Sequence, residues 1–318
     1  MGQFSIILNQ IGGFLIFLAL GVFLRRKTGI LNESSLFAIS EIVIKVSLPA
    51  FIFTSTVSGT TLQDFTSAGP VILIMILVYV ILYVVGIVFC RIFHLKGNTA
   101  NAYRLCLTFG NVGLVGVPIV TELYPTAAMV IIAVATVVDQ LVMWTYGVNL
   151  SYDTESGQKV RFDAKKIRDI LLNPPLVAIV ISLIFVAGGW HLPSVLDTAL
   201  VRIGSMVTPL GMMYVGGMLE WSDIRYAVKR IEIYVFIIFK MIVLPVFVYF
   251  IMIRVGIAQD MSGTYAVLLS VPVFMAATIL TKNNGSDDKI AAGMLMLSTV
   301  AFIVTYPIAS VLISLVPV

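Results

Sequence analysis

The stretch from Pro70 to Cys90 carries no charged side chain over a length that is enough to cross a lipid bilayer. About 20 mostly apolar residues in a helix span the roughly 30 Å hydrocarbon core. Similar runs recur along the whole chain, which predicts ten membrane spans. We expect them at residues 3–24, 36–57, 70–90, 103–122, 127–150, 172–190, 198–219, 231–253, 263–282 and 290–314.

The composition is that of an integral membrane protein. Hydrophobic residues make up 59% of the 318 residues and charged residues only 11%, which is too little polar surface to cover a soluble globule. Because backbone polar groups in hydrocarbon need partners within the chain, we expect an all-α membrane protein. The net charge of +4 comes without a cluster of basic and aromatic residues, so no nucleic-acid partner is expected.

The positions of the basic residues predict the orientation of the chain. Most of the 20 Lys and Arg residues lie in alternate connections, such as Arg25 to Lys27 after the first span and Lys159 to Arg168 after the fifth. Cytoplasmic loops keep an excess of Lys and Arg, so these connections should face the cytoplasm. We therefore expect a multi-pass protein of the cell inner (plasma) membrane with both termini outside.

The polar segment Ser151 to Pro175 divides five expected spans from five. An odd number of spans in each half forces the second half to cross the membrane in the opposite sense, so the halves can be related only as an inverted repeat. Prolines in the second, seventh, fourth and ninth spans favour that relation, at Pro49, Pro209, Pro118 and Pro272. The expected units are a first five-helix repeat (1–150), a cytoplasmic linker (151–172) and a second, inverted five-helix repeat (173–318).

Glycine and proline should interrupt the fourth and ninth spans. Gly113, Gly116 and Pro118 lie in one short stretch, and proline removes a backbone donor while glycine loosens a helix. We expect a loosened or interrupted helix around Gly113 to Pro118 and within Leu268 to Thr278, which contains Pro272. Broken helices in matching positions of inverted halves indicate a transport site at mid-membrane, where the second half-helix offers its amides to an anion. Close helix packing at small residues is the alternative.

The stretch Phe109 to Val120, FGNVGLVGVPIV, resembles the signature of the auxin efflux carrier family. That family places an asparagine seven residues before the proline of its fourth span, as Asn111 precedes Pro118. The stretch Ser270 to Ile308 is similar to the family's ninth and tenth spans, with Pro272 at the crossover. The short linker is similar to that of bacterial members.

The resemblance implies a fold similar to bile acid sodium symporters, with broken crossover helices in spans 4 and 9. Spans 1, 2, 6 and 7 would form a scaffold, and spans 3–5 and 8–10 a mobile transport core. The implied function is efflux or exchange of small organic anions such as mono- or dicarboxylates by elevator-type alternating access. We also expect a homodimer formed through the scaffold.

Polar residues within the expected spans are the candidate site residues, because a polar group in the membrane is costly and tends to be functional. Asp139 and Gln140 lie near the middle of the fifth span, where they could bind a coupling proton or sodium ion or tie neighbouring helices together. Lys240 in the eighth span could pair with Asp139 or meet the substrate anion. The expected substrate-binding residues are Asn111, Gly113, Gly116, Pro118, Pro272 and Val273.

Several function classes lack their motifs. The chain has no His-rich metal spacing, no serine elbow and no Walker sequence, so we expect no enzyme, no metal site and no cofactor beyond the coupling ion. Asp287 and Asp288 are interpreted as the start of the last span rather than as metal ligands. Glu41 and Lys45, four residues apart, should pair on one helix face. The alternative function is an anion channel or facilitator, ahead of an intramembrane enzyme.

Overall fold

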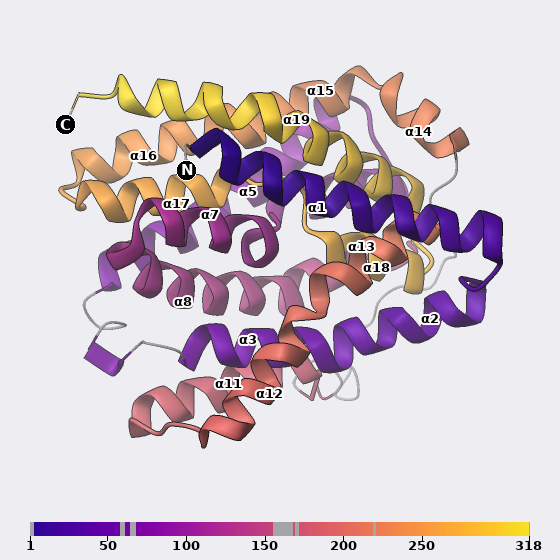
Figure 1. Ribbon diagram of the computed structural model, residues 1–318. Helices are drawn as coiled ribbons and strands as arrows, with labels where there is room; N and C mark the ends of the chain where they lie inside the picture. The colour runs from indigo at the N-terminus through magenta and orange to yellow at the C-terminus, as the bar shows by residue number, and fades with distance from the viewer. Residues whose placement is uncertain are drawn as a thin grey trace.

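The computed structural model describes residues 3–57, 61–63, 68–154, 168, 172–218 and 221–317. Every regular element in this part of the chain is helical (Figure 1). Most of the expected linker, residues 155–167 and 169–171, lies outside the described residues. The all-α prediction is therefore confirmed for the part that the structure describes.

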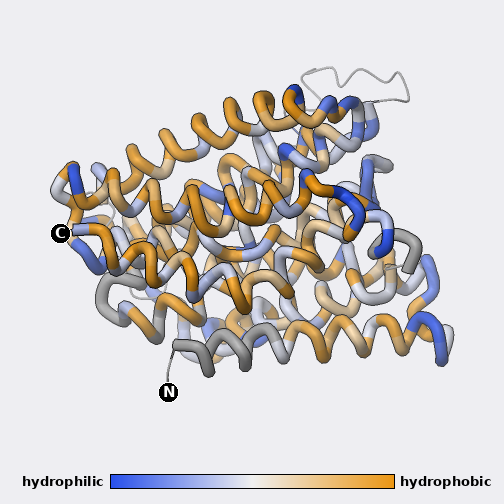
Figure 2. The backbone as a smooth tube through the Cα atoms, turned by 90° about the horizontal axis from the view of Figure 1, so that it is seen from above, coloured by the Kyte–Doolittle hydropathy of each residue, from blue (hydrophilic) through white to orange (hydrophobic). Residues whose placement is uncertain are grey.

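Six helical stretches among the described residues are long and apolar enough to cross a membrane. A further apolar helix, Pro174–Gly188, is shorter. Figure 2 shows apolar residues along the middle of the helices and hydrophilic residues concentrated toward the two ends of the molecule. The six stretches are Glu33–Val57, Gly69–Ile92, Val130–Leu150, Ser194–Met218, Ile231–Arg254 and Asp288–Ser314.

The helices follow the expected spans closely, and short π-helical turns (η) interrupt several of them. The N-terminal part contains α1 (Gln3–Phe23), η1 (Leu24–Thr28), α2 (Glu33–Ile42), η2 (Val43–Ser47), α3 (Leu48–Val57), α5 (Gly69–Ile92), α6 (Gly97–Thr108), η3 (Val112–Gly116), α7 (Val117–Leu123), α8 (Pro125–Val142), η4 (Met143–Gly147) and α9 (Val148–Leu150). The C-terminal part contains α11 (Pro174–Gly188), α12 (Ser194–Ser205), α13 (Val207–Met218), α14 (Trp221–Val228), α15 (Ile231–Ile238), η5 (Phe239–Val243), α16 (Leu244–Arg254), α17 (Gln259–Ser270), α18 (Met275–Asn283) and α19 (Asp288–Ser314).

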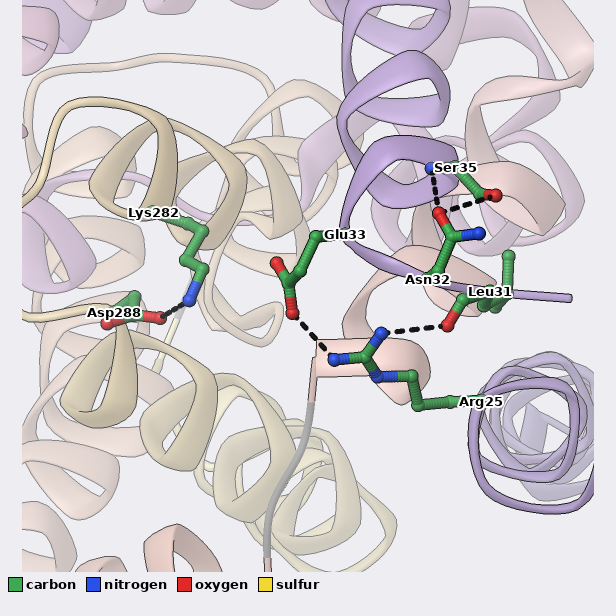
Figure 3. Close-up of polar contacts among 7 residues, drawn as sticks. All are labelled: Arg25, Leu31, Asn32, Glu33, Ser35, Lys282 and Asp288. Carbon is green, nitrogen blue, oxygen red and sulfur yellow. Dashed lines mark hydrogen bonds and ion pairs between the residues drawn. The ribbon is translucent and has the colours of Figure 1, made fainter. Parts of the chain in front are cut away.

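Side-chain caps start two of these helices. The Asn32 side chain accepts a hydrogen bond from the Ser35 amide at 2.9 Å and starts α2. The Asp287 side chain accepts one from the Ile290 amide at 3.1 Å and starts α19, which confirms the interpretation of the acidic pair. Asp288 in the first turn of α19 also pairs with Lys282 at 3.3 Å (Figure 3). The expected pair of Glu41 and Lys45 is present as well.

Packing joins helices from the two halves of the chain. α1 packs along α13, and α3 packs against α11 and α12 (Figure 1). α5 packs against α6, α16 against α17, α8 against α17, and α6 against α19. The contacts of α1 and α3 with α11, α12 and α13 build one layer from both halves of the chain. The contacts among α5, α6, α8, α16, α17 and α19 build a second group, also from both halves.

A polar clamp ties together three chain segments at one end of the molecule. The clamp contains the start of α6, the residues after α9 and the connection from α18 to α19. Tyr152 and Gly285 form an isolated antiparallel bridge. The side-chain bonds of the clamp are Asn98 Nδ2 to Asp153 Oδ1 (2.6 Å), Thr99 Oγ1 to Asp287 Oδ2 (2.6 Å) and Asn284 Nδ2 to Ser151 Oγ (2.6 Å).

Glycines allow α1 and α13 to pack with their backbones in direct contact. A Cβ atom at Gly21 would lie 2.2 Å from the carbonyl oxygen of Met213, and one at Gly216 would lie 2.1 Å from that of Leu18. No flexible side chain is available to move at either contact, so the two helices themselves would have to separate. Small residues allow this kind of close packing between membrane helices.

We expect Gly216→Ala to lower the thermal stability of the purified protein in detergent. The added methyl group must push α13 away from α1, at a cost of about 1–3 kcal/mol. Gly12→Ala in α1, the other helix of the pair, is the control, because no atom lies within 4 Å of its Cβ position. Equal melting temperatures for the two variants would show that the contact does not limit stability.

Candidate functional site

The first interruption lies between α6 and η3. α6 ends at Thr108, Phe109 has an extended backbone, and the helix resumes at Val112. Gly113 to Pro118 is helical but contains most of the π-helical turn η3, so this stretch is loosened as expected, and the full interruption precedes it. In η3, Val117 donates to the Val112 carbonyl, and this wider turn accommodates Pro118, which has no amide hydrogen to donate.

The second interruption lies where the sequence predicts it. α17 ends at Ser270 and α18 begins at Met275. Val271 and Phe274 on either side of the break have extended backbones, and Pro272 lies between them. Proline at this point costs no helical hydrogen bond.

The two interruptions meet and exchange backbone hydrogen bonds. Gly110 and Val273 form an antiparallel bridge. The Asn111 amide donates to the Pro272 carbonyl at 2.8 Å, and the Phe274 amide donates to the Phe109 carbonyl at 3.2 Å. Ser298 Oγ of α19 accepts from the Val273 amide at 3.1 Å.

This pairing changes the relation between the prolines. Residues 109–111 face residues 272–274, so Pro272 lies in its break whereas Pro118 lies in the first turn of α7. The two prolines therefore lie at different places relative to the interruptions of their helices. A Cβ atom at Gly110 would lie 2.8 Å from the Val271 side chain, so it is Gly110 that permits the close approach.

Asn111 is the polar side chain at this crossing that has no partner. It is 1% exposed, and both its Nδ2 and its Oδ1 are buried without a hydrogen bond. An unpaired buried polar group costs about 1–3 kcal/mol. Asn111 thus has one donor group and one acceptor group that the described protein does not use.

Two further hydroxyl groups, Ser47 Oγ and Thr278 Oγ1, are buried without a partner in the same way. Asn283 Nδ2 donates to Ser40 Oγ at 3.2 Å and joins α18 to α2. Thr278 precedes Asn283 by five residues and Ser47 follows Ser40 by seven. At the rise of a helix, the two hydroxyl groups therefore lie roughly 8 Å and roughly 10 Å along their helices from that bond. Sequence reasoning missed both residues, because Ser and Thr in helices usually bond to a preceding carbonyl and carry no separate signal.

Glycine contacts cover the crossing from the α3 and α13 side. A Cβ atom at Gly113 would lie 2.5 Å from the Phe51 ring, and one at Gly211 would lie 2.0 Å from the Met275 side chain. Gly116 packs in the same manner against Leu268 of α17. Gly113 and Gly116 therefore have the close packing role that the sequence left open as an alternative.

A small cavity behind the crossing contains the two buried charges. Asp139 and Lys240 both line it, together with Tyr79, Gly110 and Tyr265 among others. Its volume is about 30 Å³, which is room for one or two water molecules. Within the described residues Asp139 and Lys240 form no direct ion pair.

Asp139 is held by neutral donors. Its Oδ1 accepts from the Tyr79 hydroxyl at 2.5 Å, and its Oδ2 accepts from Gln140 Nε2 at 3.2 Å. Trp144 Nε1 donates to Gln140 Oε1 at 3.0 Å and fixes the amide orientation. Asp139 and Gln140 therefore act as one hydrogen-bonded unit.

Lys240 caps the broken end of α6. Its Nζ donates to the carbonyl groups of Cys106 at 3.0 Å and Leu107 at 2.8 Å. These carbonyls lie in the last turn of α6, where the helix dipole favours a positive charge. Lys240 thus supplies hydrogen bonds that the interrupted backbone lacks.

We expect Lys240→Met to lower the melting temperature strongly. Two carbonyl groups would lose their donor inside the protein, at a cost of roughly 2–5 kcal/mol. The exposed Lys229→Met, in the turn before α15, is the control and should stay within about 0.5 kcal/mol of the parent. A Lys240→Met protein as stable as the Lys229→Met protein would contradict the capping role.

Comparison with known proteins gives the family. Residues 8–310 match the model of a family described as membrane transport protein. An uncharacterized transporter of Methanocaldococcus jannaschii is 25% identical over 281 residues, which cover 85% of this chain and 87% of that protein. The family description is that of a transporter and not of an enzyme, in agreement with the sequence. The chain therefore belongs to this family of membrane transport proteins, the auxin efflux carrier family that its sequence resembles.

Proposed function

We propose that the protein is a secondary carrier that exports or exchanges small organic anions such as mono- or dicarboxylates. The observation that carries this proposal is Asn111, whose amide is buried at the crossing with both polar atoms unpartnered. An amide NH2 group can donate to a carboxylate, and a bound anion would compensate the cost of leaving it unpaired.

The start of α18 supports an anionic substrate. Its nine residues begin at Met275, directly after the second break, and amides at a helix N-terminus attract negative charge. The buried, unpartnered Thr278 hydroxyl lies in its first turns. Pro272 and Val273 bring this helix start to Gly110 and Asn111.

Each predicted site residue has a role in the proposed site. Asn111 contacts the substrate. The backbone beside it is shaped by Gly113, Gly116 and Pro118, and α18 is positioned by Pro272 and Val273.

The proposed architecture is ten transmembrane helices in two inverted five-helix repeats, 1–150 and 173–318. Matching contacts support it: α1 on α13 corresponds to α11 on α3, and α5 on α6 corresponds to α16 on α17. The two hydrogen bonds between the breaks have the same symmetry. A rotation that exchanges the halves would put the Asn111–Pro272 bond in the place of the Phe274–Phe109 bond. In this architecture both termini face outward and the linker at 151–172 is cytoplasmic.

The proposed mechanism is elevator-type alternating access. α1, α2, α3, α11, α12 and α13 would form the scaffold and the remaining spans the core. The core is held together by the polar clamp and by the bonded breaks. Its contacts with the scaffold include the apolar packing of Phe51 on Gly113 and of Met275 on Gly211, and the hydrogen bond from Asn283 to Ser40, which a movement of the core would break. We propose that the core slides at these contacts, and that a homodimer forms through the scaffold.

Asp139, Gln140 and Lys240 are proposed as the coupling or support unit. Asp139 faces the cavity and is held by neutral donors, so it can take up a proton or sodium ion without breaking an ion pair. Lys240 connects this cavity to the end of α6, and thereby to the backbone that leads into Asn111.

We expect Asn111→Ala to abolish or strongly weaken substrate binding and to leave the protein monodisperse. Its side chain makes no hydrogen bond within the described protein, so its removal should not cost stability. Thermal shifts across a panel of mono- and dicarboxylates identify a ligand of the parent and then test the variant. Asn101→Ala on α6 is the control, and unchanged affinity in Asn111→Ala would remove Asn111 from the site.

Counterflow of the identified anion in proteoliposomes distinguishes a carrier from a channel. Unlabelled substrate on the far side should stimulate uptake of labelled substrate, because exchange requires a carrier cycle. Flux without such stimulation would favour the anion channel or facilitator.

We expect Asp139→Asn to transport without dependence on the ion gradient. Asparagine keeps the size of the side chain and an acceptor for Tyr79, but it cannot bind a proton or balance a sodium ion. Asp197→Asn in the first turn of α12 is the control. Unaltered pH and sodium dependence in Asp139→Asn would end the coupling role.

A further inference from the structure

Arg104 is a partly buried charged residue of α6 that the proposed transport site does not use. Its side chain lies between two of the apolar helical stretches, α5 and the one that contains η4. Within the described residues no carboxylate lies within ion-pairing distance of it. A cation inside a membrane is costly, so an arginine without a counter-ion calls for a partner.

Two tyrosines and a glycine form a cradle for the guanidinium. Arg104 Nη2 donates to the Tyr146 hydroxyl at 3.1 Å, and Cζ lies 5.6 Å from the centre of the Tyr83 ring. The two rings contact each other edge to face at 5.5 Å. A Cβ atom at Gly86 would lie 3.3 Å from Arg104 Cγ, so the glycine makes room for the side chain along α5.

The cradle leaves hydrogen-bonding capacity unused. A guanidinium has five N–H donors in a planar fork, and Tyr146 takes one of them. The Nε atom is buried without a partner. Tyr83 is 44% exposed, so the cradle opens to the outer surface rather than into the protein. The unused donors and the uncompensated charge point to an anion that approaches from the lipid.

The position within the membrane fits a headgroup in one leaflet. Tyr83 lies roughly 13 Å from the Ile92 end of α5, and Tyr146 roughly 6 Å from the Leu150 end of α9. The bond between Asn98 and Asp153 places these ends on the same side as the start of α6 at Gly97. Side chains on a helix lean toward its N-terminus, so Arg104 leans toward that side, and arginine reaches for the headgroup level.

We propose that Arg104, Tyr83 and Tyr146 bind the phosphate of an anionic phospholipid in the leaflet next to the Gly97 end. The guanidinium fork matches two phosphate oxygens, and the Tyr146 hydroxyl is adjacent to them. An anionic lipid neutralises the charge of Arg104, whereas a zwitterionic lipid brings its own cation. The site stands independently of the substrate, because it lies outside the crossing of the two breaks.

Lipid-dependent thermal stability of the full chain tests this proposal. The protein in uncharged detergent is titrated with dioleoyl phosphatidylglycerol, dioleoyl phosphatidylcholine or water-soluble glycerol 1-phosphate. The expected result is a melting temperature that rises by about 3 °C or more with phosphatidylglycerol and clearly less with the other two. Equal shifts with both lipids would overturn an anionic lipid site, and an equal shift with glycerol 1-phosphate would assign the site to a soluble phosphate instead.

Substitutions in the cradle test whether the rise in melting temperature with phosphatidylglycerol depends on these residues. Arg104→Gln should lose most of the phosphatidylglycerol shift, and Tyr146→Phe part of it, while Tyr83→Phe keeps the ring and the shift. Arg254→Gln is the matched control, since Arg254 also lies over a ring, Phe250 at 5.1 Å, but at the exposed end of α16. A full shift in Arg104→Gln would overturn the proposal. If that variant does not fold, Arg104→Lys and native mass spectrometry take its place: the lysine protein should retain one phosphatidylglycerol fewer than the parent, and equal retention would overturn the site.

Discussion

Backbone hydrogen bonding at the two helix breaks is the constraint on which the rest of this structure depends. A membrane interior offers no water to an interrupted helix, so each break must find its partners within the protein. The two breaks solve this by bonding to each other, from Asn111 to Pro272 and from Phe274 to Phe109. Lys240 takes two carbonyls of α6, and Ser298 accepts from Val273. The chain itself therefore supplies these partners at the crossing, whereas both polar atoms of the buried Asn111 side chain have none.

The contacts of the two helix groups differ in kind, and this difference is what a moving core requires. Within the group around the crossing, polar bonds connect segments that are far apart in sequence, as in the bonds of Asn98 to Asp153 and Asn284 to Ser151. Toward α3 and α13, the contacts at Gly113 and Gly211 are van der Waals contacts of a ring and a thioether. A displacement along the second kind of contact breaks few directional bonds, whereas a displacement within the first group breaks many.

The positions of the helices could be predicted from short stretches of sequence. The candidate site could not, because it is built by contacts between residues that lie far apart in the chain. Apolar runs gave the helical stretches, and the caps at Asn32 and Asp287 follow from residue type. The stretch Gly113 to Pro118 is loosened by a π-helical turn, as expected, but the full interruption comes before it, at a place that composition does not encode. Proline positions alone do not show which residues meet at the crossing, because the register there is set by Gly110 facing Val273. The acceptors of Lys240 are carbonyl groups, which every residue carries, so no sequence signal could identify them.

The buried charges of this protein use different partners, and the difference has a functional consequence. Lys240 is balanced by the carbonyl end of a half-helix, and Asp139 by a hydroxyl and an amide. Because neither charge has the other as its direct partner, a change at Asp139 need not release Lys240 from α6. The same cavity nevertheless joins them, so their charges interact through a low dielectric. In the proposed carrier, an ion bound at Asp139 would therefore alter the electrostatic field at the end of α6 without removing the hydrogen bonds that hold this end, which is what coupling to a substrate at Asn111 would need.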